Sequence, residues 1–175
     1  MPPTVATPEI AATRSRLQEY AAVYSREHAT TLKVLYAFPA ERASYRPHER
    51  SDSALQLAWR FVMENNVALG ALRGKLDLDG ARFAPPPSFA DVVAAYEKSA
   101  RELLELLPLV AESRLDENVT FFTGPKQMGD VPVGELLWFL LLGSVHHRGQ
   151  MSVYVRCNDG KVPSIYGPSA DEPWS

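Results

Sequence analysis

The apolar positions along the chain fall into four long segments, and in three of them they recur with helical spacing. Positions three and four apart lie on one face of a helix, so each of these segments predicts an amphipathic helix with one buried side. The apolar positions are Ile10, Leu17, Tyr20, Tyr24, Leu32 and Leu35 in the first segment, Leu57, Phe61, Val62 and Leu69 in the second, and Val92, Val93, Tyr96 and Leu103 in the third.

The fourth segment lies within residues 131–158 and changes character midway. From Val133 to Leu142 it is apolar on nearly every side, which is typical of a helix packed against several neighbours. From Gly143 onward polar residues interrupt the run, while the helical spacing of Leu142, Val145 and Val153 continues. A buried helix that becomes polar halfway along its length usually lines a cavity, and we expect the same here.

Local signals place the ends of these helices. A hydroxyl residue before the first turn caps free N–H groups, proline is tolerated in that first turn, and proline or glycine ends a helix. The predicted starts are Thr7 followed by Pro8, Ser53 with Gln56, Ser88 with Asp91, and Pro132; the predicted ends are near Phe38, Leu72, Leu107 and Asn158.

The connecting segments complete the predicted fold. Residues 74–87 contain two glycines and three successive prolines, and they form a long loop. Residues 115–123 have a β-like composition without an evident partner strand, so we expect an extended connection followed by a loop over 124–130. Residues 161–175 predict an extended tail. The expected fold is all-α, an antiparallel four-helix bundle with a long crossover and an extended C-terminal tail, in a single domain over residues 1–175.

Composition and charge narrow the classes of partner. The formal net charge of −3 and the isoelectric point near 5.8 give no electrostatic footprint for nucleic acid or for an anionic membrane. The N-terminus has no basic start followed by an apolar run, and Cys157 is the single cysteine, so we expect a cytoplasmic protein without an internal disulfide.

Histidines and charged residues on two segments are the candidates for chemistry. His146 and His147 are adjacent on the fourth helix and point about 100° apart, so the two cannot readily share one metal ion. Arg60 and Glu64 lie one turn apart on the second helix, and their spacing alone favours a solvated ion pair.

Several strings of residues resemble the DinB-like proteins, also called the DinB/YfiT-like metalloenzyme group. They are HHRGQMSVYVR at 146–156, KVPSIYGPSADE at 161–172, Tyr45-Arg46-Pro47, Leu57-Ala58-Trp59 and the helix start over 88–99. The resemblance implies a four-helix bundle, often dimeric, with a divalent ion held by three histidines. One of these follows the Leu-Ala-Trp segment, and two form a His-x-x-x-His pair ahead of Arg-Gly-Gln. It also implies activities such as thiol-dependent transfer or hydrolysis in some members.

This chain departs from the family pattern at two of the three histidine positions. Arg60 follows Trp59 where the first histidine is expected, Gly143 stands at the first position of the last-helix pair, and only His147 matches as a metal ligand. A lone imidazole cannot hold a catalytic metal ion, and a guanidinium facing it would repel one. We therefore expect a degenerate metal site and no cofactor.

The expected replacement is a metal-free pocket that binds a small molecule or an anion. We expect Arg60 to bind a carboxylate or phosphate with Glu64 as an internal partner, Gly143 to enlarge the cavity, and His147 and Gln150 to line it. The ligand-binding candidates are therefore Arg60, Glu64, His147 and Gln150.

Two other interpretations remain open at this point. One is an enzyme, either a hydrolase or thiol-dependent transferase with zinc, nickel or manganese at a site rebuilt from His147, His146 and Glu64, or a metal-free enzyme with His147 as general base. The other is a mainly structural role. In each case we expect a homodimer joined through apolar helix faces that the core does not need.

Overall fold

The computed structural model describes residues 14–78 and 84–174. Within these ranges the chain forms four long helices: α1 (Arg16–Tyr36), α2 (Ala54–Arg73), α3 (Phe89–Leu106) and α4 (Val133–Cys157). Short 3-10 turns connect them at Ala40–Arg42, Leu107–Leu109 and Glu112–Asp116. The four predicted helices are thus confirmed. The predicted helix start at Thr7 lies outside the described residues; within them, α1 begins at Arg16.

Side-chain caps fix where the helices begin. Ser53 accepts a hydrogen bond from the backbone of Gln56 while the Gln56 side chain accepts one from the backbone of Ser53, as the sequence predicts. Ser88 caps α3 through the backbone N–H of Asp91. Gly74 ends α2 with a φ of 71°, a left-handed conformation that glycine adopts without strain.

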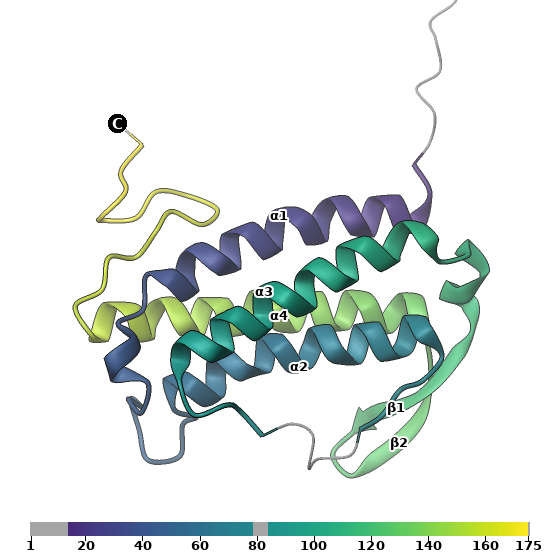
Figure 1. Cartoon of the computed structure of the whole chain (residues 1–175), viewed down its shortest axis with the longest axis horizontal. Helices are drawn as coiled ribbons and strands as arrows, with labels where there is room; N and C mark the ends of the chain where they lie inside the picture. The colour runs from purple at the N-terminus through teal and green to yellow at the C-terminus, as the bar shows by residue number, and fades with distance from the viewer. Residues whose placement is uncertain (1–13, 79–83, 175) are drawn as a thin grey trace, which may run out of the picture.

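The four helices lie side by side along the length of the molecule (Figure 1). Helix α2 packs against α3 and α4, and α1 packs against α4 and α3. Helices α2 and α3 run in the same direction, and α1 and α4 run in the opposite one, so the end of α2 and the start of α3 lie at opposite ends of the molecule (Figure 1). The predicted long crossover is therefore present between α2 and α3.

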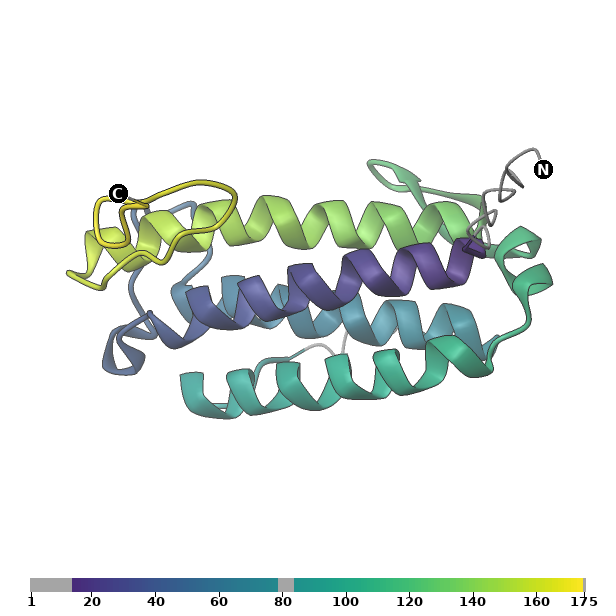
Figure 2. The same cartoon turned by 90° about the horizontal axis from the view of Figure 1, so that it is seen from above.

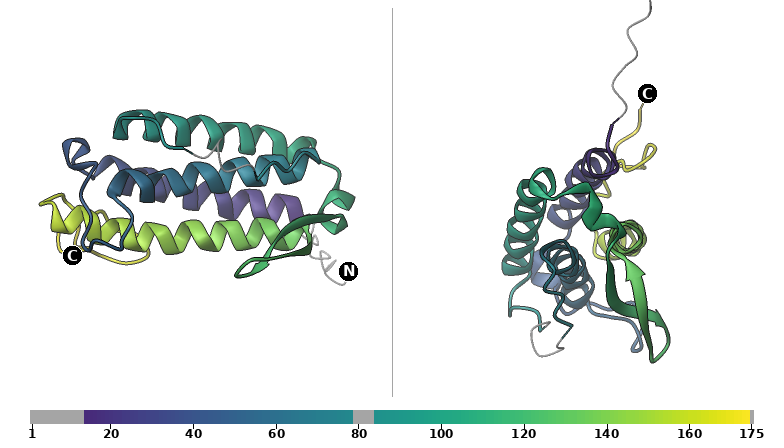
Figure 3. Two further views of the ribbon diagram at one scale, coloured as in Figure 1. Left: turned by 90° about the horizontal axis from the view of Figure 1, so that it is seen from below. Right: turned by 90° about the vertical axis from the view of Figure 1, so that its right-hand side faces the viewer.

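A β-hairpin replaces the loop expected before α4, and the all-α class is corrected accordingly. Strand β1 (Asn118–Gly124) pairs antiparallel with β2 (Gln127–Pro132), from Asn118 opposite Pro132 to Gly124 opposite Gln127. Lys126 has a φ of 60° in the turn. The hairpin projects from the end of the molecule where α4 begins (Figure 3). The extended connection expected over 115–123 was wrong because its partner strand carries Gly129 and Asp130, which have low β propensity.

The core consists of two apolar clusters with buried polar side chains between them. One cluster lies toward the hairpin and includes Leu103, Val133 and Leu136; the other lies toward Ala40–Arg42 and includes Phe61 and Met151. Among the described residues, the buried polar side chains are those of Thr31, Ser53, Asn65, Ser99, Ser144 and Arg148, and of these Ser53 lies apart, at the start of α2. Such groups are costly to bury unless they are hydrogen-bonded, so this layer is where a site is sought.

The C-terminal tail is extended, as the sequence predicts, and lies against the ends of α1 and α4 (Figure 2). Asp171 forms an ion pair with Arg156 of α4 and accepts a hydrogen bond from the backbone of Val162. Tyr166 anchors the tail to α1 through Glu27, whereas Trp174 stays exposed. None of the helices in the described part is both long enough and apolar enough to cross a membrane.

Candidate functional site

The site is organised by Glu64 of α2 and His147 of α4. One carboxylate oxygen of Glu64 lies 2.9 Å from Nδ1 of His147, and the other accepts a hydrogen bond from the hydroxyl of Ser144. Phe61 packs against the imidazole in an edge-to-face arrangement, with ring centroids 6.3 Å apart. Glu64 and His147 expose 13% and 19% of their side chains, so these contacts fix the imidazole with little competition from water.

Gly143 does not enlarge the cavity, contrary to the expectation from the sequence. A Cβ atom at this position would lie 2.7 Å from Oε1 of Glu64, which is closer than van der Waals contact allows. The carboxylate of Glu64 therefore occupies the space that a side chain at position 143 would need. Glycine at this position is what lets Glu64 reach His147 and Ser144.

Arg60 does not pair with Glu64, its neighbour one turn along α2. Its Nε donates to the carboxylate of Asp52 at 2.6 Å, and 47% of its side chain is exposed. Within the described residues the two terminal amino groups of Arg60 make no hydrogen bond to the protein. Asp52 thus orients the guanidinium and leaves its terminal edge available to a ligand.

Two pockets meet at Arg60 and His147, which line both of them. The first has a volume of about 510 Å³, and its wall includes the polar residues Asp52, Gln150 and Tyr154. The second has a volume of about 330 Å³ and also includes Glu64, but otherwise its lining is apolar: Met63, Val67, Leu78, Phe121, Phe122 and Leu140. All four candidates from the sequence therefore line one or both pockets: Arg60, Glu64, His147 and Gln150.

The donor groups do not fit the three-histidine metal site that the resemblance implies. Arg60 cannot coordinate a cation, Gly143 has no side chain, and Glu64 fills the space beside it. In residues 14–78 and 84–174, no three histidine, cysteine, aspartate or glutamate side chains lie close enough together to hold a metal ion. His147 and Glu64 are thus two donors, and His146, the third member of the alternative site, is exposed on another face of α4.

Arg148, which follows His147 on α4, is a charged residue that is almost fully buried. It exposes 1% of its side chain and forms an ion pair of 2.7 Å with Glu27 of α1. It also donates hydrogen bonds to the backbone oxygen of Glu27 and to the hydroxyl of Tyr166, and lies 5.0 Å from the centroid of the Tyr166 ring. The ion-pair partner lies 121 residues away in the sequence, so sequence spacing alone does not reveal the contact.

A separate chain of hydrogen-bonded polar groups, which sequence reasoning missed, lies in the core next to Glu64. The Tyr24 hydroxyl donates to Asn65 at 2.8 Å, and the Asn65 amide donates to Ser99 at 3.0 Å. Burial raises the pKa of Tyr24 and of Tyr20, the largest effect on each, so both hydroxyls keep their protons. Asn65 stood among the apolar positions of α2, and a polar residue on a buried stripe was the one available signal.

The arrangement supplies a fixed imidazole, an oriented guanidinium and an apolar compartment. If Nδ1 of His147 carries the proton shared with Glu64, then Nε2 has the free lone pair. Arg60 can donate two parallel hydrogen bonds to a carboxylate or phosphate. The site can therefore bind an anionic group next to a proton acceptor.

Comparison with known proteins identifies relatives over most of the chain. A family model described as the DinB superfamily matches residues 24–151. The uncharacterized protein YrdA of Bacillus subtilis (strain 168) is 30% identical over 151 residues, which cover 83% of this chain and 85% of YrdA.

Solved structures share the fold. A crystal structure of a DinB-like protein from Bacillus cereus ATCC 10987 superposes with a TM-score of 0.69 at 24% identity, covering 84% of this chain and 95% of that one. The DinB-like protein YjoA of Bacillus subtilis superposes with a TM-score of 0.63 at 18% identity, covering 90% and 99% of the two chains. Together with the match over residues 24–151, these relationships show that the chain belongs to the DinB superfamily.

Proposed function

We propose that this DinB-superfamily protein is a metal-free small-molecule-binding protein, and that Arg60 binds an anionic group of its ligand. The observation that carries the proposal is the position of the Glu64 carboxylate. It fills the space beside Gly143, holds Nδ1 of His147 and takes the hydrogen bond of Ser144. The Glu64 carboxylate, with its internal partners, thus takes the place of the first histidine of the last-helix pair, and Arg60 provides the positive charge at the pocket.

The charges around the pocket favour one strong contact rather than a highly charged ligand. Arg60 contributes one positive charge, and Asp52 and Glu64 contribute two negative ones. Asp52 uses only Nε of Arg60, so a carboxylate can bind the terminal amino groups but must share the guanidinium with Asp52. Gln150 lines the same pocket and offers an amide donor. These features favour a ligand with a single negative charge.

The test is an NMR titration of the protein with butyrate, a small monocarboxylate. We expect chemical-shift changes at the side chains of Arg60 and Gln150, their loss in Arg60→Gln, and tighter binding in Asp52→Asn, which removes the competing carboxylate. Elemental analysis of protein purified without chelator should give zinc, nickel and manganese far below one ion per chain. Stoichiometric metal, or unchanged butyrate binding in Arg60→Gln, would overturn the proposal.

A second candidate function is metal-free general-base catalysis by His147. What favours it is the contact between Glu64 and Nδ1, because a carboxylate that fixes the tautomer of an imidazole leaves Nε2 as a proton acceptor. Hydrolysis of p-nitrophenyl butyrate that is abolished by His147→Gln, with a pH profile that changes in Glu64→Gln, would support it. A metal-dependent hydrolase or thiol-dependent transferase would need donors in addition to His147 and Glu64.

We also infer that the four helices form the bundle expected from the sequence. A separate inference is that two copies of the chain associate through the outer face of α4. Phe139 and Leu142 expose 63% and 65% of their surfaces, and Val153 continues the same face. Light scattering should give a dimer for the parent protein and a monomer for Leu142→Glu. A parent protein that stays monomeric over a wide concentration range would contradict the inference.

A further inference from the structure

The apolar pocket beside β1 has the features of a compartment for the hydrocarbon part of a ligand. Its volume of about 330 Å³ is at the lower end of the range for small-molecule sites, which is about 300–1,000 Å³. Six of its nine lining residues are apolar, and the remaining three are Arg60, Glu64 and His147. Of these, Arg60 and His147 also line the neighbouring pocket that includes Asp52 and Gln150. A ligand that fills this compartment therefore has its polar group at the junction of the two pockets.

The groups at this junction select the charge of that polar end. Both carboxylate oxygens of Glu64 already have partners within the protein, Ser144 and His147. The terminal amino groups of Arg60 have none among the described residues. The junction thus presents unused donors carrying a positive charge, and a carboxylate complements them better than a neutral or cationic group does.

We propose that the ligand is an amphipathic monocarboxylate, with its carboxylate on Arg60 and its hydrocarbon chain in the pocket between α2, α4 and β1. This inference rests on the anionic site proposed above and adds the chemical class of the ligand. It gives a role to the hairpin, which the sequence did not predict. Phe121 and Phe122 of β1 close one side of the pocket, and the hairpin thereby limits the length of chain that fits.

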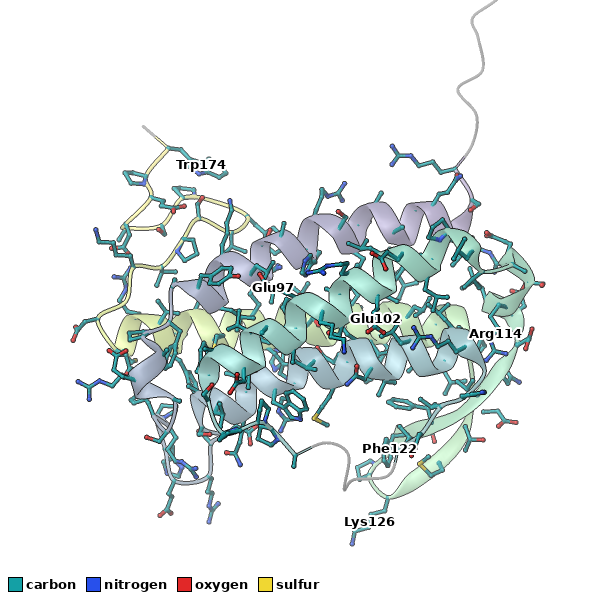
Figure 4. The ribbon with its side chains drawn as sticks, viewed as in Figure 1. Glu97, Glu102, Arg114, Phe122, Lys126 and Trp174 are labelled. Carbon is teal, nitrogen blue, oxygen red and sulfur yellow. The ribbon has the colours of Figure 1, made fainter. Side chains whose placement is uncertain are left out.

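Phe122 is the wall residue that can be changed with the least effect on the fold. It exposes 56% of its surface, whereas its neighbour Phe121 is buried against Phe139 at 6.2 Å between ring centroids. Figure 4 shows Phe122 beside the hairpin, on the side that faces the helices. Met128 lies directly opposite Phe122 on β2 and is also exposed, but it does not line the pocket, so it provides a matched control.

The experiment compares butyrate, octanoate and decanoate by titration calorimetry and NMR. Each methylene that enters an apolar pocket should tighten Kd by up to about fourfold until the pocket is full. Met63→Trp fills the compartment from α2 and should abolish the gain in affinity with chain length. Phe122→Ala should weaken decanoate binding more than butyrate binding, and Met128→Ala should change neither. 1-Decanol, which lacks the charge, should bind more weakly than decanoate.

The outcomes separate this inference from the site on which it rests. If the three acids bind with equal affinity and Met63→Trp has no effect, the hydrocarbon compartment is wrong while the anion site stands. If Arg60→Gln leaves decanoate and butyrate binding unchanged, the anion site itself is wrong. If 1-decanol binds as tightly as decanoate, the pocket takes an apolar molecule without the charge, and the assignment of a carboxylate is overturned.

Discussion

Oε1 of Glu64 lies 2.9 Å from Nδ1 of His147, at the place where a side chain on residue 143 would stand. The contact joins α2 to α4 across 83 residues of sequence and depends on the absence of a Cβ atom at Gly143. Because the second carboxylate oxygen is bound by Ser144, both oxygens of Glu64 are held by side chains of α4. Three residues of α4 and one of α2 thus act as a unit, and changing one should alter the effect of changing another.

Gly143→Ala should destabilise the protein although alanine favours helices. The added methyl group displaces Oε1 of Glu64, and the loss of a buried hydrogen bond to a charged group costs about 1.5–3 kcal/mol, against a helix-propensity gain of about 1 kcal/mol. In a Glu64→Ala background the clash disappears and the same substitution should stabilise.

The control is Gly149→Ala. The new Cβ has no atom of another part of the protein within 4 Å, so this substitution should stabilise the protein in both backgrounds. The measurement is urea denaturation; equal effects of Gly143→Ala in the two backgrounds would show that Glu64 and residue 143 are independent.

Restoring the family histidines should create a zinc site only when Glu64 is removed as well. Arg60→His and Gly143→His together supply two imidazoles beside His147, but Glu64 occupies the space of the second one. The triple variant with Glu64→Ala should bind zinc much more tightly than the parent protein or the Arg60→His/Gly143→His double variant, as measured by competition with a chromophoric chelator. Gly149→His on the exposed face of α4 is the control. A parent protein that binds zinc as tightly as the triple variant would mean that His147 and Glu64 suffice.

Arg148→Met should be strongly destabilising, because it leaves Glu27 without its ion-pair partner. Breaking a buried ion pair by removing one member costs about 3–5 kcal/mol, and Arg148 and Glu27 expose 1% and 14% of their side chains. Arg156→Met removes the exposed ion pair with Asp171, which also holds the tail, and should cost about 1 kcal/mol or less. Urea denaturation measures both, and similar costs would show that Arg148 contributes no more than a surface arginine.

Much of the fold was predictable because its signals are local. The Ser53–Gln56 capping box, the Ser88 cap and the helical spacing of the apolar positions each depend on residues a few positions apart, and the structure has helices at all of these places. The hairpin was missed because its stability comes from pairing with a weak partner strand, Gln127–Pro132, and from packing of Phe121 on α4. Such contacts leave little trace in local composition.

The candidate residues named from the sequence lie at one pocket, but their contacts were not predictable. His147, Arg60 and Gln150 line that pocket, whereas spacing alone paired Arg60 with Glu64 and the structure pairs it with Asp52, just before the start of α2. The choice between these partners depends on which side of α2 faces α4, and the sequence does not specify that angle. The filling of the Gly143 position by Glu64 is likewise a relation between two helices, with no sequence spacing to reveal it.

His28 should make the protein less stable as the pH falls below the ordinary histidine range. Burial lowers its pKa from the ordinary value of 6.5, and the nearby Glu97 carboxylate opposes this shift only in part. The ring lies between Tyr24 and Tyr96, with centroids 6.1 and 5.1 Å away, and its buried Nδ1 has no hydrogen-bond partner among residues 14–78 and 84–174. Both neighbouring tyrosines stay neutral because burial raises the pKa of each, so neither stabilises an imidazolium.

The sign follows from comparing the folded and unfolded chains. Above a pH of about 6.5 His28 is neutral in both states; below it the unfolded chain takes up the proton first, so stability falls until the folded-state pKa is reached. The measurement is urea denaturation of the parent and of His28→Phe at pH values of about 7.5 and 5.5. On going to the lower pH, the parent should lose more unfolding free energy than His28→Phe does. His28→Phe keeps an aromatic ring between the two tyrosines. Because the carboxylates titrate equally in both proteins, their contribution cancels in the difference between parent and variant. A pH-independent difference, or an NMR titration of His28 with a midpoint above 6.5, would contradict this account.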